Sequence, residues 1–162
     1  LEAAKIVLPS AVAMALYALG AHITGGLGIR FAVAYLLYCL LLEISVLKSS
    51  CVHCYYYGKV CGLGKGRLCS WLFRRGDSRR FAEREVSWCA MVPDMMVLVF
   101  PLVVGIVLLI REFAWPLVAS LALLVLLSLG GNAIVRGTFA CRHCRQRELA
   151  CPAEKLFSGN KA

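Results

Sequence analysis

Residues 90–110 read AMVPDMMVLVFPLVVGIVLLI, and Asp94 is the one charged side chain in this stretch. Roughly 20 consecutive apolar residues are enough for a helix to cross the hydrocarbon core of a bilayer. In that core the backbone must satisfy its own hydrogen bonds, which a helix does within its own segment. The stretch therefore predicts a transmembrane helix.

Three further stretches have the same character, at residues 6–23, 29–47 and 113–135. Hydrophobic residues make up 60% of the chain. A small soluble domain has little room to bury four helices that are apolar all round, so a soluble core is disfavoured. We predict an all-α integral membrane protein with four transmembrane helices.

One cysteine pattern, Cys-x-His-Cys-x6-Cys, follows both the second and the fourth apolar stretch. Its first copy consists of Cys51, His53, Cys54 and Cys61. Its second copy lies 90 residues later and consists of Cys141, His143, Cys144 and Cys151. Four matches at a single offset indicate an internal duplication.

The duplication divides the chain into two repeats, residues 1–62 and 90–152. A basic, glycine-rich linker at 63–89 joins them, with an interfacial helix expected from Asp77, and residues 153–162 form a tail. Each repeat is a hairpin of two spans followed by a cysteine block. Two spans return the chain to its starting side, so we expect a parallel repeat about an axis along the membrane normal.

Basic residues favour one side of the predicted membrane domain. Of 18 Lys and Arg residues, 15 lie in 48–85 or after 135, and Lys5 is expected on the same side. The positive-inside rule makes this side cytoplasmic, together with both termini and both cysteine blocks. The net charge of +9 then fits anionic lipid headgroups and requires no nucleic acid. A partner membrane subunit or a homo-oligomer is also compatible.

The cysteine blocks favour a metal site because cytosolic thiols are kept reduced. Two cysteines three residues apart can both reach one ion, and tetrahedral zinc takes four ligands. The duplication supplies four thiolates, from Cys51, Cys54, Cys141 and Cys144. Zinc is the favoured metal, and iron or an iron–sulfur cluster is the alternative.

Other cysteines and the two block histidines are secondary candidates. Either the chain turns back after each cysteine pair, or a second site forms from Cys61, Cys151, Cys69, His53 and His143. The histidines can also act as outer-shell or lipid-facing groups. Cys39 and Cys89 fit buried thiols without a ligand role.

Two carboxylates, Glu43 and Asp94, fall inside predicted spans, close in depth to the cysteine blocks. An unpaired carboxylate in a membrane is costly, so both are candidates for cofactor binding or proton transfer. In the alternative, each pairs with a Lys or Arg whose side chain reaches toward the membrane surface.

The chain has no Gly-x-Ser-x-Gly, His-Glu-x-x-His or Walker pattern, so no hydrolase, metalloprotease or nucleotide-binding class is indicated. The predicted function is metal binding by a small membrane protein whose site joins the two repeats. The alternative is a membrane oxidoreductase that uses the same cysteines for electron transfer or thiol exchange with a lipid-soluble acceptor.

Overall fold

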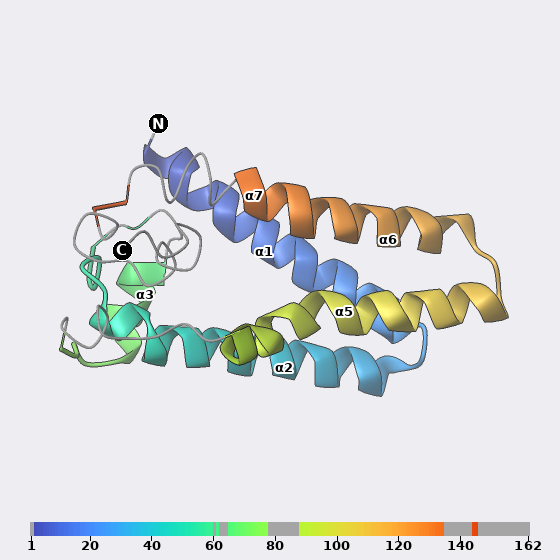
Figure 1. Ribbon diagram of the computed structural model, residues 1–162, viewed down its shortest axis with the longest axis horizontal. Coiled ribbons are helices and arrows are strands. Elements are labelled where there is room, and N and C mark those ends of the chain that lie inside the picture. The colour runs from blue at the N-terminus through green and yellow to red at the C-terminus, as the bar shows by residue number, and fades with distance from the viewer. Residues whose placement is uncertain (1, 60, 62–64, 78–87, 135–143, 146–162) are drawn as a thin grey trace.

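A computed structural model describes residues 2–59, 61, 65–77, 88–134 and 144–145, and the regular structure within these ranges is helical (Figure 1). The long helices are α1 (Glu2–Gly25), α2 (Ile29–Ser49), α5 (Trp88–Arg111) and α6 (Trp115–Leu126). A π-helical turn, η2 (Leu127–Gly131), continues α6 into α7 (Asn132–Ile134). Two short elements, η1 (Cys51–His53) and α3 (Lys65–Leu72), follow α2.

The long helices form two hairpins that pack together. α1 contacts α2, α5 and α6, and it crosses the molecule obliquely in Figure 1. Both hairpin turns lie at one end of the molecule, and η1 and α3 lie at the other. Gly28 closes the first turn with a φ of 130°, a conformation that side-chain-bearing residues rarely adopt.

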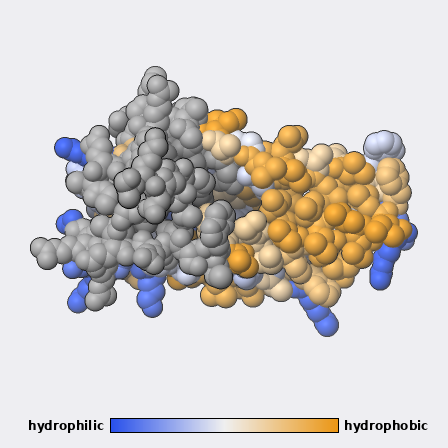
Figure 2. Space-filling model, viewed as in Figure 1, coloured by the Kyte–Doolittle hydropathy of each residue, from blue (hydrophilic) through white to orange (hydrophobic). Residues whose placement is uncertain are grey.

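Two helical segments are long and apolar enough to span a membrane, Ile29–His53 and Met91–Arg111. In the most apolar 18 residues of each segment, only 17% are buried within the chain, whereas a core helix of a soluble protein is mostly buried. Figure 2 shows hydrophobic surface over the helices towards the hairpin turns. Large exposed side chains include Ile29, Leu37, Leu41, Val103 and Ile110. These two predicted spans agree with the structure in length and composition.

Apolar side chains from three helices make the core of the bundle. The buried residues are Leu16 and Ile23 of α1, Val104 of α5, and Leu121 and Leu124 of α6. Close contact between α5 and α6 depends on a glycine, because a Cβ at Gly105 would lie 2.5 Å from Cδ2 of Leu121. Small residues permit such contacts between membrane helices.

One of the hydrogen bonds between α2 and α5 compensates for a proline. Pro101 has no N–H, so the carbonyl of Val97, four residues earlier, lacks its helical donor. The hydroxyl of Tyr35 donates to that carbonyl at 2.8 Å. The Tyr35 ring reaches it by lying directly against Gly20 of α1, where a Cβ would collide with the phenol. One aromatic side chain therefore links three helices.

Candidate functional site

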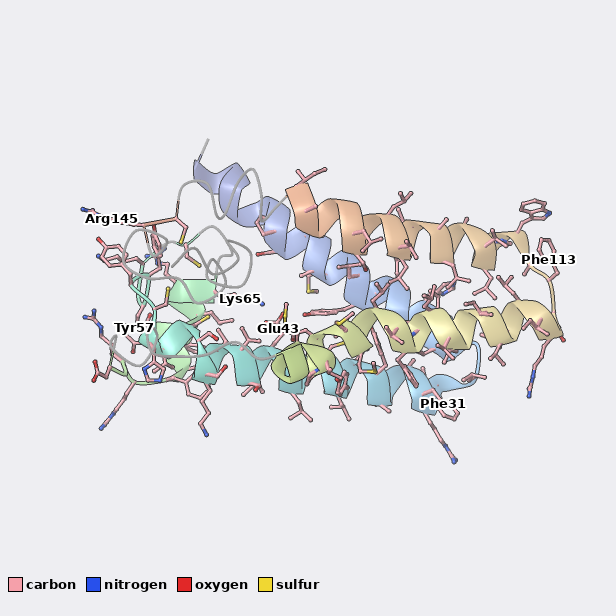
Figure 3. The ribbon with its side chains drawn as sticks, in the orientation of Figure 1. Phe31, Glu43, Tyr57, Lys65, Phe113 and Arg145 are labelled. Carbon is pink, nitrogen blue, oxygen red and sulfur yellow. The ribbon has the colours of Figure 1, made fainter. Side chains whose placement is uncertain are left out.

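The cysteine-rich end of the molecule consists of residues 50–59, 61, 65–77 and 144–145. In Figure 3, Tyr57, Lys65 and Arg145 lie at this end, and Phe31 and Phe113 lie at the opposite one. The linker between the predicted repeats contributes α3 here, a helix that the sequence had not indicated. The interfacial helix expected from Asp77 falls largely outside the described residues.

Two glycines allow the chain to fold back after η1. Gly58 has a φ of 74°, and its N–H donates to the carbonyl of Gly66 at 3.0 Å. Gly66 itself lies against the carbonyl oxygens of Tyr56 and Lys59, where a Cβ would not fit. The return of the chain brings α3 against the end of α2.

Cys69 is a packing residue in this arrangement. It is fully buried, and its Sγ donates to the carbonyl of Leu47 at 3.6 Å. That carbonyl belongs to the last turn of α2, where helical donors run out. Leu47, Val52 and Cys69 form a small core, and Cys51 packs against it. Burial raises the pKa of the Cys69 thiol, so the neutral thiol is favoured at neutral pH.

His53 is oriented by a backbone carbonyl. Its Nδ1 lies 2.9 Å from the carbonyl oxygen of Asp77, and a carbonyl accepts only, so Nδ1 carries the hydrogen. Neutral imidazole in that tautomer presents Nε2 as a lone pair, the arrangement that second-shell carbonyls give to metal-ligating histidines. A bond from the Gly76 N–H to the carbonyl of Val52, 3.1 Å long, holds the same segment.

Only part of the predicted metal site can be compared with the structure. Cys51, Cys54 and Cys144 are described, and Cys141, His143 and Cys151 lie outside the described residues. Within the described ranges, no group of three or more Cys, His, Asp or Glu side chains is placed to hold a metal ion. Cys51, Cys54, Cys61, Cys69 and Cys144 form no disulfide, and Cys61 is half-buried. The four-thiolate site stays a prediction.

The second cysteine block touches the first at Arg145. Its backbone N–H donates to the Tyr56 hydroxyl at 3.1 Å, and its guanidinium carbon lies 5.8 Å from the centroid of the Tyr55 ring. Cys144 and Cys54 directly precede Arg145 and Tyr55 in the chain. This contact brings together backbone segments that are 89 residues apart.

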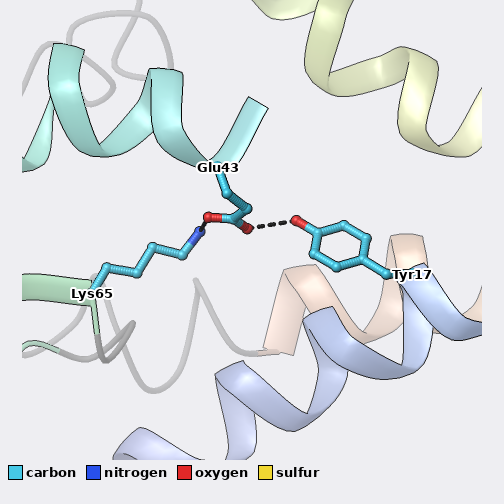
Figure 4. A network of polar contacts seen from close by, with 3 residues as sticks. All are labelled: Tyr17, Glu43 and Lys65. Atoms are coloured by element: carbon cyan, nitrogen blue, oxygen red, sulfur yellow. Dashed lines mark hydrogen bonds and ion pairs between the residues drawn. The ribbon is translucent and has the colours of Figure 1, made fainter. Parts of the chain in front are cut away.

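Glu43 is paired on both oxygens (Figure 4). The Tyr17 hydroxyl of α1 donates to Oε1, and the Lys65 ammonium of α3 donates to Oε2, each at 2.5 Å. Glu43 and Lys65 are partly exposed, at 23% and 28%. One of the two sequence interpretations, pairing with a lysine, therefore describes Glu43. The network connects α1, α2 and α3, and neither Tyr17 nor Lys65 was identified from the sequence.

Asp94 differs from Glu43 in its surroundings. It is exposed on α5, one residue after Pro93, whose carbonyl accepts a hydrogen bond from the Tyr38 hydroxyl at 2.9 Å.

No family model, curated protein or solved structure matches the chain. The function of the protein must therefore be argued from its thiols, the Glu43–Lys65 ion pair and the contact between the two cysteine blocks.

Proposed function

We propose that this chain is an integral membrane protein with four transmembrane helices. α1 has 24 residues, which at about 1.5 Å per residue exceeds the roughly 30 Å of hydrocarbon in a bilayer. α6 continues through η2 and α7 to Ile134. Exposed Phe113 and Trp115 meet edge to face at the hairpin turn, and tryptophan is enriched at the membrane interface.

The helix contacts support two hairpins related by a pseudo-two-fold axis. Such an axis would exchange α1 with α5 and α2 with α6. It would therefore relate the α1–α2 contact to the α5–α6 contact, and the α1–α6 contact to the α2–α5 contact. All four contacts occur, and the α1–α5 contact maps onto itself. A parallel repeat with its axis between α1 and α5 explains this pattern.

In this proposal a metal ion joins the two halves, held by Cys51, Cys54, Cys141 and Cys144. The observation that carries it is the contact of Arg145 with Tyr55 and Tyr56. Positions 55 and 145 are equivalent in the duplication, and equivalent residues meet where a two-fold axis passes. The cysteine preceding each of them is thereby drawn towards the same axis. Zinc is the proposed metal, with iron or an iron–sulfur cluster as the alternative.

The cysteine-rich end is proposed to face the cytoplasm, with the chain in the cytoplasmic membrane. Lys48, Lys59, Lys65, Arg67, Arg74 and Arg75 all lie between residues 48 and 75, whereas Arg30 and Arg111 lie beside the hairpin turns. This asymmetry follows the positive-inside rule. Reducing conditions on that side would keep the thiols available for a metal.

Elemental analysis of the purified full chain in detergent tests the proposal. We expect about one metal ion per chain, and Cys51→Ser and Cys141→Ser should each lower metal content and melting temperature together, because one lost thiolate weakens the whole site. Cys39→Ala, inside α2, is the matched control and should keep the metal. Full metal in Cys141→Ser together with loss in Cys51→Ser would disprove a shared site.

A second candidate is a membrane redox protein, favoured by the Glu43 network. This network runs from α1 and α2 to α3, the helix that carries Cys69, and proton-coupled electron transfer needs a titratable group near the thiols. Colour separates a zinc site from a redox-active iron centre, since iron–thiolate centres absorb visible light and bleach on reduction whereas zinc sites are colourless. In the redox case Glu43→Gln should abolish electron transfer and leave metal content unchanged.

A further inference from the structure

The surface around Tyr55 carries two cations on one aromatic ring. The Lys59 ammonium lies 4.3 Å from the ring centroid, and the Arg145 guanidinium carbon lies 5.8 Å from it. Both basic side chains are exposed. Cation–π attraction holds each to the ring, but the two like charges repel one another. Each cation lies within about 6 Å of the same centroid, and an anion that contacts both would offset their repulsion.

Tyr56 adds a neutral donor to the same place. Its ring meets the Tyr55 ring edge to face, with centroids 5.2 Å apart. Its hydroxyl oxygen accepts the Arg145 N–H at 3.1 Å, so the hydroxyl hydrogen can point to another acceptor. An ammonium, a guanidinium and a phenol together suit an anion with several oxygens, of which phosphate is the common example.

The surface around Tyr55 lies at the depth of lipid headgroups when α2 crosses the bilayer. Residues 55–59 follow the end of α2 by only a few positions, so they lie at the membrane surface when α2 crosses the bilayer. The surrounding chain is basic, and Lys65, the nearest lysine that follows, is already paired with Glu43. Anionic headgroups concentrate at such surfaces.

We propose that Lys59 and Arg145, positioned by the Tyr55 ring, bind the phosphate of an anionic lipid headgroup. The placement at the bilayer surface rests on the proposed membrane topology, and the metal site is not required. Lys59 belongs to the first repeat and Arg145 to the second, so the bound lipid bridges the two halves. The proposal thus places one specific lipid-binding site within the broad basic surface.

Titration of the delipidated full chain with short-chain phosphatidylglycerol in a non-ionic detergent tests the site by calorimetry. Lys59→Gln and Arg145→Gln should each weaken binding about fivefold or more, the contribution of one basic residue near anionic lipid. Tyr55→Leu should weaken it similarly, and Tyr55→Phe, which keeps the ring face, should retain binding. Arg74→Gln removes a charge that is also exposed, elsewhere on this end, and should change binding less than about twofold.

Three results would overturn the proposal. Equal weakening by Arg74→Gln would mean diffuse attraction without a site. Short-chain phosphatidylcholine binding as tightly would remove the requirement for an anionic lipid, and inorganic phosphate binding as tightly would make the ligand a free anion. Metal content, measured on the same variants, should equal that of the unaltered chain, so absence of metal from every preparation would refute the metal site and leave the lipid result standing.

Discussion

The helix bundle (α1, α2, α5 and α6) and the cysteine-rich end are held together in different ways. In the bundle, apolar side chains such as Leu121 and Leu124 share the contact area, and no single pair determines it. At the cysteine-rich end, individual donors satisfy individual carbonyls. The Tyr57 hydroxyl donates to the carbonyl of Phe73 at 2.6 Å, and Cys69 donates to that of Leu47.

This difference predicts how each region responds to substitution. Apolar contacts are non-directional, so a bundle position tolerates changes that preserve volume. A buried carbonyl with one donor loses that partner completely when the donor changes. Substitutions at the cysteine-rich end and at the few polar contacts of the bundle should therefore lower stability the most.

The largest effect is expected from Gly66→Ala. The new methyl group would meet two backbone oxygens, those of Tyr56 and Lys59, which cannot move without opening the turn. We expect a loss of about 3 kcal/mol in stability. Thermal unfolding in detergent, read alongside the reactivity of the buried Cys69 thiol, measures it.

Gly130→Ala is the control for that substitution, since a Cβ there meets nothing within 4 Å. Its effect should stay within about 0.5 kcal/mol. Equal destabilisation by the two changes would show that the cysteine-rich end is no more sensitive to substitution than the bundle.

Glu43→Gln should have the next largest effect, about 2 kcal/mol, because it weakens hydrogen bonds to a charged group and leaves Lys65 without its ion pair. Asp94→Asn, at an exposed position, should change the melting temperature little. Melting of both variants in the same detergent checks the comparison, and a larger cost for Asp94→Asn would contradict it.

Tyr35→Phe should cost about 1 kcal/mol by leaving the Val97 carbonyl without a donor. The effect should nearly vanish in a Pro101→Ala background, because alanine, unlike proline, supplies the helical N–H to that carbonyl. A double-mutant cycle of the two positions, followed by thermal unfolding, measures the coupling. Additive effects would mean that the hydroxyl does not act through this carbonyl.

The smallest effect concerns pH. Burial raises the folded-state pKa of Cys69 above that of an unfolded thiol. The folded chain then holds its proton while the unfolded chain loses it, so this contribution to stability is full below the ordinary thiol pKa and falls as pH rises above it. The melting temperature should drop slightly between about pH 7 and about pH 9.5. In Cys69→Ala the drop should be smaller, and an equal drop would exclude Cys69 as its source.

The sequence predicted the helices better than their contacts. Apolar length located the stretches at 29–47 and 90–110, and the helices observed there are Ile29–Ser49 and Trp88–Arg111. It predicted a transmembrane helix at 113–135, where the structure has α6, η2 and α7 in succession. Hydrophobicity carries no information about a π-helical turn, because that turn depends on how the chain packs.

The partners of Glu43 could not be predicted for a geometric reason. Tyr17 is nearer to the first hairpin turn than Glu43 is, so a sequence alignment of the two helices about the turn does not pair them. The two helices run antiparallel, and each Cα–Cβ bond tilts toward the N-terminus of its own helix, so the Tyr17 and Glu43 side chains lean towards one another and meet. Lys65 reaches Glu43 because α3 folds back against α2, which requires the close approach at Gly66. In contrast, composition alone indicated a thiol-rich and basic end.

The π-helical turn η2 determines which face the helix beyond it presents to the bundle. Such a turn takes up one residue more than an α-helical turn, so an uninterrupted α-helix of the same sequence would have everything beyond the turn rotated by about 100°. Leu121 and Leu124, before the turn, would keep their places in the core. Gly131, whose position faces Val12 of α1, would turn away. One residue of length at this point thus sets the direction in which the chain leaves the bundle towards its second cysteine block.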